Sequence, residues 1–141
     1  MDSNFQKPKI IVICGATGIG KTAVGIELAE RLGGEIVSAD SMQIYRHMDV
    51  GTAKPTPAEQ ARIAHHMIDI VDPDDDFDAV QYSAQARGSI TDIDSRGLIP
   101  LVVGGTGLYI KALLHGLFPS KPVDPAIRAR LKLEAEEKGS L

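Results

Sequence analysis

The residues best suited to chemistry form a glycine-rich loop near the start of the chain. The loop reads G-x-x-x-x-G-K-T, and its members are Gly15, Ala16, Thr17, Gly18, Ile19, Gly20, Lys21 and Thr22. Glycines let the backbone curl so that successive N–H groups point at phosphate oxygens, and the N-terminus of a following helix adds positive partial charge. In this pattern the lysine reaches the terminal phosphate and the threonine hydroxyl can ligate Mg²⁺. The loop predicts a site for a di- or triphosphate; the alternative is a glycine-rich connection that binds nothing.

Phosphate binding does not name a reaction, so the position of a carboxylate is the next question. Nucleotide hydrolases carry an acid after an apolar strand, but here the apolar run 101–103 is followed by Gly104. Asp69 and Asp72 also follow apolar pairs, where aspartate is more often a turn residue. Asp40 follows a short apolar stretch, and its local sequence favours equally a catalytic carboxylate and a cap for the turn that begins at Ser41.

Alternating strands and helices are expected to position these residues. The β-branched run 9–14 is typical of a central strand covered on both faces, and further strands are expected at 35–38, 66–71 and 99–103. Helices are expected at 21–32, 57–63 and 79–96, directly after residue 107, and at 125–138. This order predicts an α/β fold: a P-loop NTPase-like, doubly wound and mostly parallel sheet with helices on both faces. Ligands of such sheets bind at the carboxyl ends of the strands, where both glycine-rich turns fall.

The composition is that of a single globular domain without a visible nucleic-acid footprint. The chain has 141 residues, of which 43% are hydrophobic and 24% charged, and its net charge is −4. It lacks a basic tract, and three Phe, three Tyr and no Trp leave few platforms for stacking bases. Cys14 is the only cysteine, which excludes a disulfide scaffold, and we expect it to be a small buried residue.

Nothing in the sequence predicts a membrane segment. The longest apolar run, 10–14, is far too short to span a bilayer, and the first nine residues lack a signal-peptide pattern. We therefore expect a cytoplasmic protein without membrane contact.

Five motifs in one order closely resemble the tRNA dimethylallyltransferase family. The phosphate loop is followed by SADSMQIY at 38–45, MDVGTAKP at 48–55, HHMID at 65–69 and VGGTGLY at 103–109. The resemblance runs from about residue 9 to residue 130. It implies that the phosphate loop holds dimethylallyl diphosphate, with Mg²⁺ as cofactor, and that the allyl group moves to N6 of adenosine 37 in the anticodon loop of tRNA.

The resemblance also assigns roles to individual residues. It implies that Asp40 is the general base and that Thr17 lies near the diphosphate. It further implies tRNA contacts for a larger set, which consists of Asp40, Ser41, Met42, Gln43, Thr106 and Arg128. An arginine on a charged helix is equally often only solvated, so both readings of Arg128 stay open.

The main departure from the family is length, and it leaves alternatives. Family members continue well past the equivalent of residue 141, so we expect residues 1–141 to be the P-loop catalytic core, an N-terminal part without the helical tRNA-binding insertion, and a monomer. We then expect the isolated chain to bind diphosphate with little or no transfer activity. The alternatives are an adenylate prenyltransferase of the cytokinin type, a small-molecule P-loop kinase that binds ATP, and a non-catalytic nucleotide-binding module. Ser41 and the string 51–54 favour the tRNA-acting branch, and no arginine cluster of a kinase lid follows the last expected strand.

Overall fold

Four short parallel strands form the sheet that positions the phosphate loop. In a computed structural model of the chain, which describes residues 6–117 and 124–139, the strands are β1 (Ile11–Cys14), β2 (Gly34–Ser38), β3 (His65–His66) and β4 (Ile99–Gly104). Their order in the sheet is β1-β4-β2-β3, and every neighbouring pair is parallel. Leu101 of β4 lies opposite Ile11 on one side and Ile36 on the other, so β4 is one of the two interior strands of the described sheet, with β2.

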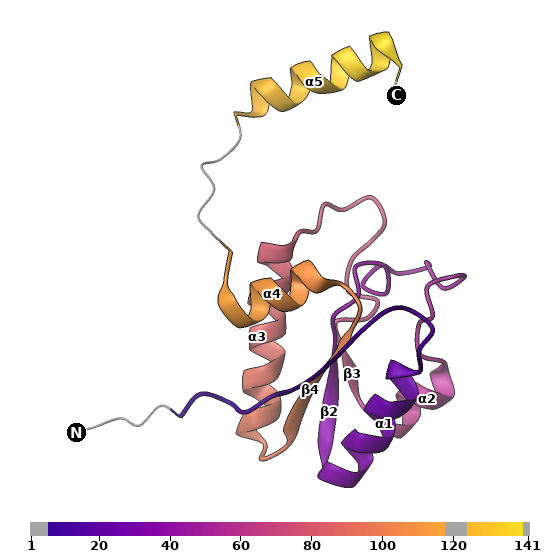
Figure 1. Cartoon of the computed structure of the whole chain (residues 1–141), viewed down its shortest axis with the longest axis vertical. Coiled ribbons are helices and arrows are strands. Elements are labelled where there is room, and N and C mark those ends of the chain that lie inside the picture. Colours follow the sequence, from indigo (N-terminus) through magenta and orange to yellow (C-terminus); the bar gives the residue numbers. More distant parts are fainter. Residues whose placement is uncertain (1–5, 118–123, 140–141) are drawn as a thin grey trace, which may run out of the picture.

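Helices cover both faces of this sheet, which confirms the doubly wound α/β fold (Figure 1). On one face, α1 (Lys21–Leu32) packs Ile26 and Ala29 against Ile36 and Leu101. On the other, α3 (Ala79–Ser95) and α4 (Gly107–His115) pack against Val37, Val102 and their neighbours. Side chains of successive strand residues alternate between the two faces, so adjacent residues of one strand enter different cores.

Capping residues set the limits of the helices where the sequence predicts them. Thr56 opens α2 (Pro57–Arg62) and Asp78 opens α3, each with a complete capping box. Gly33, in the left-handed conformation at φ 68°, ends α1, and Gly97 at φ 74° follows α3. The expected helix 125–138 is α5 (Pro125–Lys138), which buries none of its residues. No helix in the described ranges is both long and apolar enough to cross a membrane.

Two predictions about strands are wrong in position or extent. The run 9–14 is not central among the described strands, because β1 pairs only with β4, and its last residue, Cys14, is exposed rather than buried. Of the expected strand 66–71, only His66 lies in a strand, as the second residue of β3. Met67 at φ 66° and Asp69 at φ 53° have left-handed backbones that no strand accommodates, and only Val71 rejoins the pattern, through an isolated bridge to Tyr45.

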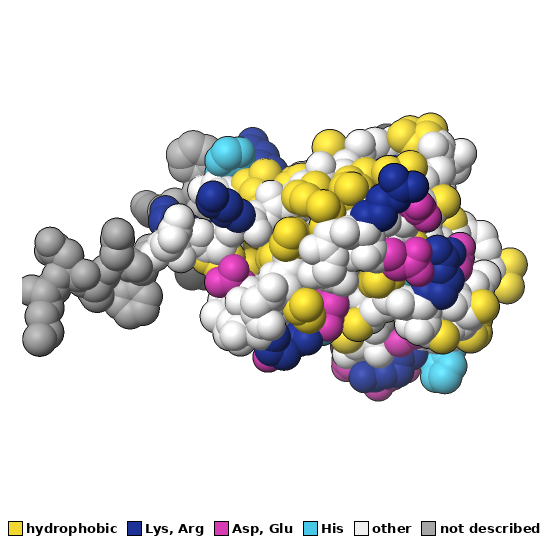
Figure 2. Space-filling model, turned by 90° about the horizontal axis from the view of Figure 1, so that it is seen from below, with side chains coloured by type: hydrophobic (Ala, Val, Ile, Leu, Met, Phe, Trp, Pro, Cys, Tyr) yellow, Lys and Arg dark blue, Asp and Glu magenta, His cyan; other side chains and the backbone are white. Residues whose placement is uncertain are grey.

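Some of the charged side chains on the surface form ion pairs. Seen from below the view of Figure 1, several basic side chains lie next to acidic ones, and apolar atoms fill much of the surface between these clusters (Figure 2). The best-buried acid of these pairs is Glu35 of β2, whose side chain is 14% exposed and bonds both guanidinium nitrogens of Arg96, at 2.7 and 2.8 Å. The bonds from Arg96, with help from His66 and against the effect of burial, lower the pKa of Glu35 to about 2.

This lowered pKa predicts a defined pH dependence of stability. Because the folded pKa of Glu35 is about 2 and its ordinary value is 4.5, the carboxylate stabilises the fold above pH 4.5, and that contribution is lost as the pH falls through 2. We expect Glu35→Gln to lower the free energy of unfolding at pH 7 by about 1 to 3 kcal/mol and to flatten its pH dependence between 5 and 2. Urea unfolding at several pH values measures both. The control is Glu27→Gln, which removes a 53% exposed acid paired with Arg31; equal slopes for the two variants would contradict the prediction.

Candidate active site

The carboxyl ends of the parallel strands enclose a cavity of about 280 Å³ beside the phosphate loop. The loop joins β1 to α1, Asp40 lies just after β2, and Gly104 ends β4. Residues of all three segments line the cavity, together with part of the 53–68 stretch. The lining residues are Thr17, Gly18, Gly20, Lys21, Thr22, Ile36, Ser38, Asp40, Gln43, Ala53, Pro55, Glu59, His65, Ile68, Val103 and Gly104.

The loop has the backbone that phosphate binding requires. Gly18 at φ 83° and Gly20 at φ 90° adopt left-handed conformations that other residues rarely reach. Gly20 is the N-cap of α1 and has no side chain with which to cap it, so the first N–H groups of the helix are available to an anion. Lys21 bonds the Ala16 carbonyl through Nζ, at 2.5 Å, and shares the cavity with Thr22 of the first helical turn.

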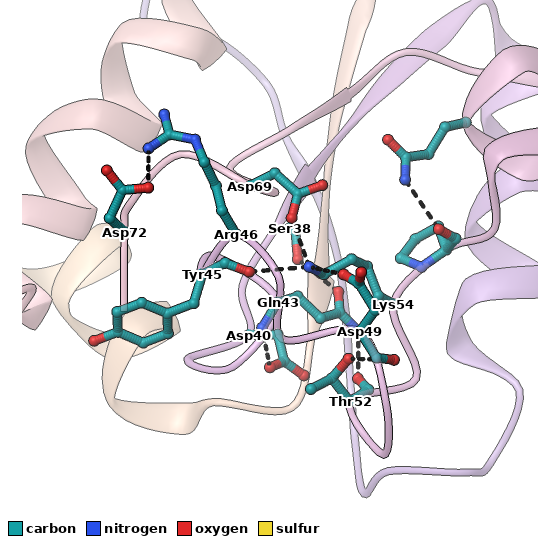
Figure 3. A network of polar contacts seen from close by, with 12 residues as sticks. Ser38, Asp40, Gln43, Tyr45, Arg46, Asp49, Thr52, Lys54, Asp69 and Asp72 are labelled. Carbon is teal, nitrogen blue, oxygen red and sulfur yellow. Dashed lines mark hydrogen bonds and ion pairs between the residues drawn. The ribbon is translucent and has the colours of Figure 1, made fainter. Parts of the chain in front are cut away.

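Asp40 caps the turn that follows it and also lines the cavity. Its Oδ1 accepts hydrogen bonds from the backbone N–H groups of Met42 at 2.8 Å and Gln43 at 3.1 Å, so it caps the turn (Figure 3). Its Oδ2 makes no hydrogen bond to any residue in the described ranges, and Asp40 lines the same cavity as Lys21 and Thr22. One oxygen is therefore structural, and the other is available to a ligand across from the phosphate loop.

Ser41 and Thr106, 65 residues apart in sequence, meet beside Asp40. The Ser41 N–H donates to Thr106 Oγ1 at 2.9 Å, and the Thr106 hydroxyl donates to Ser41 Oγ at 3.3 Å. The backbone N–H of Thr106 also donates to the carbonyl of Ala39 at 3.0 Å. The structure thus brings together two residues for which the sequence predicted one shared role.

Gln43 is buried and links the end of β2 to residues 52 and 53, of which Ala53 lines the cavity. Its Oε1 accepts from the Ser38 hydroxyl at 3.1 Å, and its Nε2 donates to the carbonyls of Thr52 and Ala53, both at 3.1 Å (Figure 3). The side-chain amide is thus engaged within the chain. A contact of Gln43 with RNA stays a prediction.

Other predicted site residues lie outside this cavity. Gly15 and Ala16 line a second, more open hollow on the side of α4, and Ile19 is 65% exposed. Met42 is 44% exposed, and Arg128 lies on α5, which contributes no residue to the cavity. The weaker acid candidates are used in ion pairs: Asp69 contacts Lys54 and Asp72 contacts Arg46, as expected of turn residues rather than metal ligands.

Sequence reasoning missed His65 as a cavity residue. Its Nδ1 lies 2.7 Å from the Ile63 carbonyl, which can only accept, so Nδ1 carries the hydrogen and Nε2 is a bare acceptor. Nε2 is buried and has no partner within the described part of the chain, and burial lowers the pKa of the ring. No sequence signal identified it, because it lies outside the expected strand 66–71 and its position depends on the pairing of β3 with β2.

Gly104 explains why no acid follows β4. A Cβ at this position would overlap the backbone of Ala39, because the ends of β2 and β4 approach too closely for any side chain. The aspartate that hydrolases place at such a strand end therefore has no room here. The fold and the cavity define a P-loop α/β protein in which a carboxylate, Asp40, follows β2 and lies in the same cavity as the phosphate loop.

Comparison with known proteins gives the family. Residues 43–141 match the model of the IPP transferase family, and residues 8–71 match the isopentenyl transferase model. The chain therefore belongs to the IPP transferase family.

Similar proteins agree in sequence and in fold. The tRNA dimethylallyltransferase of Desulfosudis oleivorans is 58% identical over 95% of this chain, and that of Geobacter sulfurreducens is 52% identical over 96%. The crystal structure of the tRNA isopentenylpyrophosphate transferase from Bacillus halodurans covers 94% of the chain with a TM-score of 0.77 and 42% identity. A eukaryotic dimethylallyltransferase acting on tRNA covers 95% with a TM-score of 0.76 and 32% identity. The chain spans 43% of each bacterial relative, and 44% and 33% of the two solved chains.

The close approach at Gly104 predicts that alanine lowers the free energy of unfolding much more at position 104 than at position 107. Gly104→Ala forces the ends of β2 and β4 apart, and we expect it to lower the free energy of unfolding by about 1 to 3 kcal/mol or more. Gly107→Ala is the matched control, because a Cβ there meets nothing within 4 Å. Thermal or urea unfolding measures the difference; equal stabilities of the two variants would contradict the close approach.

Proposed function

We propose that the protein to which this chain belongs transfers the dimethylallyl group of dimethylallyl diphosphate to N6 of adenosine 37 in tRNA. The observation that carries the proposal is the free oxygen of Asp40 in the same cavity as Lys21 and Thr22. The names of the similar proteins support the donor and the acceptor. The substrate class implies a cytoplasmic reaction.

The phosphate loop suits the leaving group of this reaction. As the bond between the allylic carbon and the diphosphate oxygen breaks, the carbon becomes cationic and negative charge accumulates on the diphosphate. The N–H groups at the start of α1 and the Lys21 ammonium are donors directed at that charge, which lowers the barrier. The diphosphate leaves with the electrons of the broken bond.

The site also fits Mg²⁺ as the implied cofactor. Within the described ranges no group of three His, Cys, Asp or Glu side chains could hold a metal, so a dedicated protein cage is absent there. Mg²⁺ needs no such cage, since it commonly binds through one or two protein oxygens and substrate phosphates. Thr22 Oγ1 is the oxygen we propose for it, and the bound ion would neutralise diphosphate charge.

Asp40 supplies what the acceptor amine lacks. The N6 lone pair of adenosine is delocalised into the purine ring, so the amine is a weak nucleophile. A carboxylate oxygen within hydrogen-bond reach can orient the amine and take its proton while the new carbon–nitrogen bond forms. Oδ2 is free for this, and Oδ1 is fixed by two backbone N–H groups, so the carboxylate is already oriented.

The neighbours of Asp40 are the proposed RNA contacts. Ser41 and Thr106 lie beside it, and Met42 is exposed next to them. The target base must leave its stack to reach the cavity, which is easiest in a single-stranded loop such as the anticodon loop. Arg128 on α5 is proposed as a more distant contact.

The principal test is product formation. Two proteins are compared: the one encoded by the complete reading frame that contains this sequence, and the 141-residue chain alone. Each is incubated with labelled dimethylallyl diphosphate, Mg²⁺ and unmodified tRNA. We expect prenylated adenosine in digested tRNA from the former and little or none from the latter. A parallel reaction with AMP tests the adenylate-prenyltransferase alternative, and one with ATP tests the kinase alternative. Absence of label from tRNA in the complete protein would reject the proposal.

Two substitutions should separate the role of Asp40 from that of the phosphate loop. Asp40→Asn keeps an Oδ1 that accepts both backbone bonds but replaces the free oxygen with an amide, so transfer should fall about 100-fold or more while diphosphate binding is nearly unchanged. Lys21→Ala removes a charged donor and should weaken binding of dimethylallyl diphosphate about 10- to 100-fold. Equilibrium binding and single-turnover rates distinguish the two; loss of binding in Asp40→Asn would indicate a structural role.

A further inference from the structure

A buried ammonium group lies behind the wall of the cavity that carries Asp40. The side chain of Lys54 is 6% exposed, and its Nζ donates to Asp49 Oδ1 at 2.7 Å, Asp69 Oδ1 at 2.5 Å and the Tyr45 carbonyl at 2.9 Å (Figure 3). These three acceptors use all three of its N–H groups. Lys54 is not among the residues that line the cavity, so its charge is directed into the protein rather than toward a substrate.

The ammonium is charged and well held in this position. Burial lowers the pKa of Lys54, but the hydrogen bonds to Asp49 and Asp69 outweigh burial, and the net change is upward. Its contacts join the stretch before Lys54 to the turn after β3. That region contains four left-handed residues other than glycine, His47, Ala53, Met67 and Asp69, whose backbones persist only where neighbouring contacts fix them.

The contacts of Lys54 continue toward Asp40 through Gln43. Lys54 directly follows Thr52 and Ala53, whose carbonyls accept from Gln43 Nε2. The backbone N–H of Gln43 is in turn one of the two donors that hold Asp40 Oδ1. The connection from the buried ammonium to the carboxylate is therefore partly covalent: the backbone links Lys54 to the carbonyls of residues 52 and 53, and hydrogen bonds continue from those carbonyls through Gln43 to Asp40. Lys54 also reaches Gln43 through Asp69, whose N–H donates to the Gln43 carbonyl at 3.2 Å.

We propose that Lys54 is a positioning residue for the transfer reaction, which fixes the direction of the free Asp40 oxygen through the 52–53 carbonyls and Gln43. This inference rests on the proposed function, since the oxygen it orients is the base of that reaction. Lys54 touches no substrate. Its loss should leave the phosphate loop intact and let the Asp40 turn move, and small displacements of a catalytic group reduce rates strongly.

A second cation in the same region provides a matched control. Arg46 NH1 contacts Asp72 Oδ1 at 2.9 Å and NH2 contacts the Ile70 carbonyl at 3.3 Å, so it joins nearly the same two segments. It is 43% exposed, and it makes no hydrogen bond to Gln43, Thr52 or Ala53. Arg46→Met therefore removes a cation from this region without interrupting the connection to Asp40.

The experiment compares Lys54→Met with Arg46→Met in the complete protein. Steady-state kinetics with tRNA give kcat and the KM for dimethylallyl diphosphate, and thermal unfolding reports the fold. We expect Lys54→Met to lower kcat about 10- to 100-fold with that KM changed less than about twofold, and Arg46→Met to change neither appreciably. Asp49 and Asp69 are 68% and 44% exposed, so water can solvate them when their partner is removed.

A double substitution separates positioning from general support of the fold. In single-turnover reactions, Lys54→Met should slow an Asp40→Ala protein little further, because the group that it positions is already absent. Gln43→Met interrupts the same connection while keeping the ion pairs of Lys54, and it should reproduce the loss of kcat even if Lys54→Met unfolds. An unchanged kcat in a folded Lys54→Met protein, or additive losses with Asp40→Ala, would overturn the inference. If Lys54→Met does not fold, an unchanged kcat in Gln43→Met overturns it. Failure of the unsubstituted protein to label tRNA would instead overturn the proposed function, and this inference with it.

Discussion

The close approach of β2 and β4 at their carboxyl ends is the constraint on which the site depends. The Ala39 N–H donates to the Val103 carbonyl at 2.8 Å, and the Ala39 carbonyl accepts from Thr106 N–H at 3.0 Å, so the two chains stay paired past the ends of the strands. Only glycine fits at position 104 under this condition. The pairing places Asp40 across the cavity from the phosphate loop, and it removes the space in which a hydrolase would carry its acid. The same contact thus places Asp40 at the cavity and leaves no space for an acid at position 104.

Lys21 and Lys54 differ in burial and in hydrogen-bond partners, and this difference indicates different roles. Lys21 lies in the cavity and contacts only the carbonyl of its own loop within the described ranges, which a phosphate oxygen can replace. Lys54 is enclosed and bonded to two carboxylates and a carbonyl. A desolvated ammonium is stable only with such partners, so its contacts are permanent features of the fold. The first lysine is free to bind a ligand, whereas the second holds the wall that faces that ligand.

Much of the fold followed from local sequence. The helix limits were predictable because Gly20, Gly33, Asp78 and Gly97 act on the backbone directly around them. The strand at 66–71 was not, because its apolar residues favour a strand while the left-handed conformations of Met67 and Asp69 are imposed by distant partners. Asp69 N–H donates to the Gln43 carbonyl, and its carboxylate contacts Lys54. Likewise, the apolar run of β1 indicates burial but does not say which strands lie beside it.

The sequence by itself determined the phosphate loop, the helix that follows it and the family resemblance, because each depends on residues that are neighbours in the chain. It could not find His65 in the cavity, bring Thr106 beside Ser41, or identify the partners of Lys54. Those assignments depend on pairing between segments that are 15 to 65 residues apart, such as Lys54 with Asp69 and Ser41 with Thr106. Tertiary structure decided them, because only folding brings such segments within hydrogen-bond distance and shows which polar atoms are already satisfied.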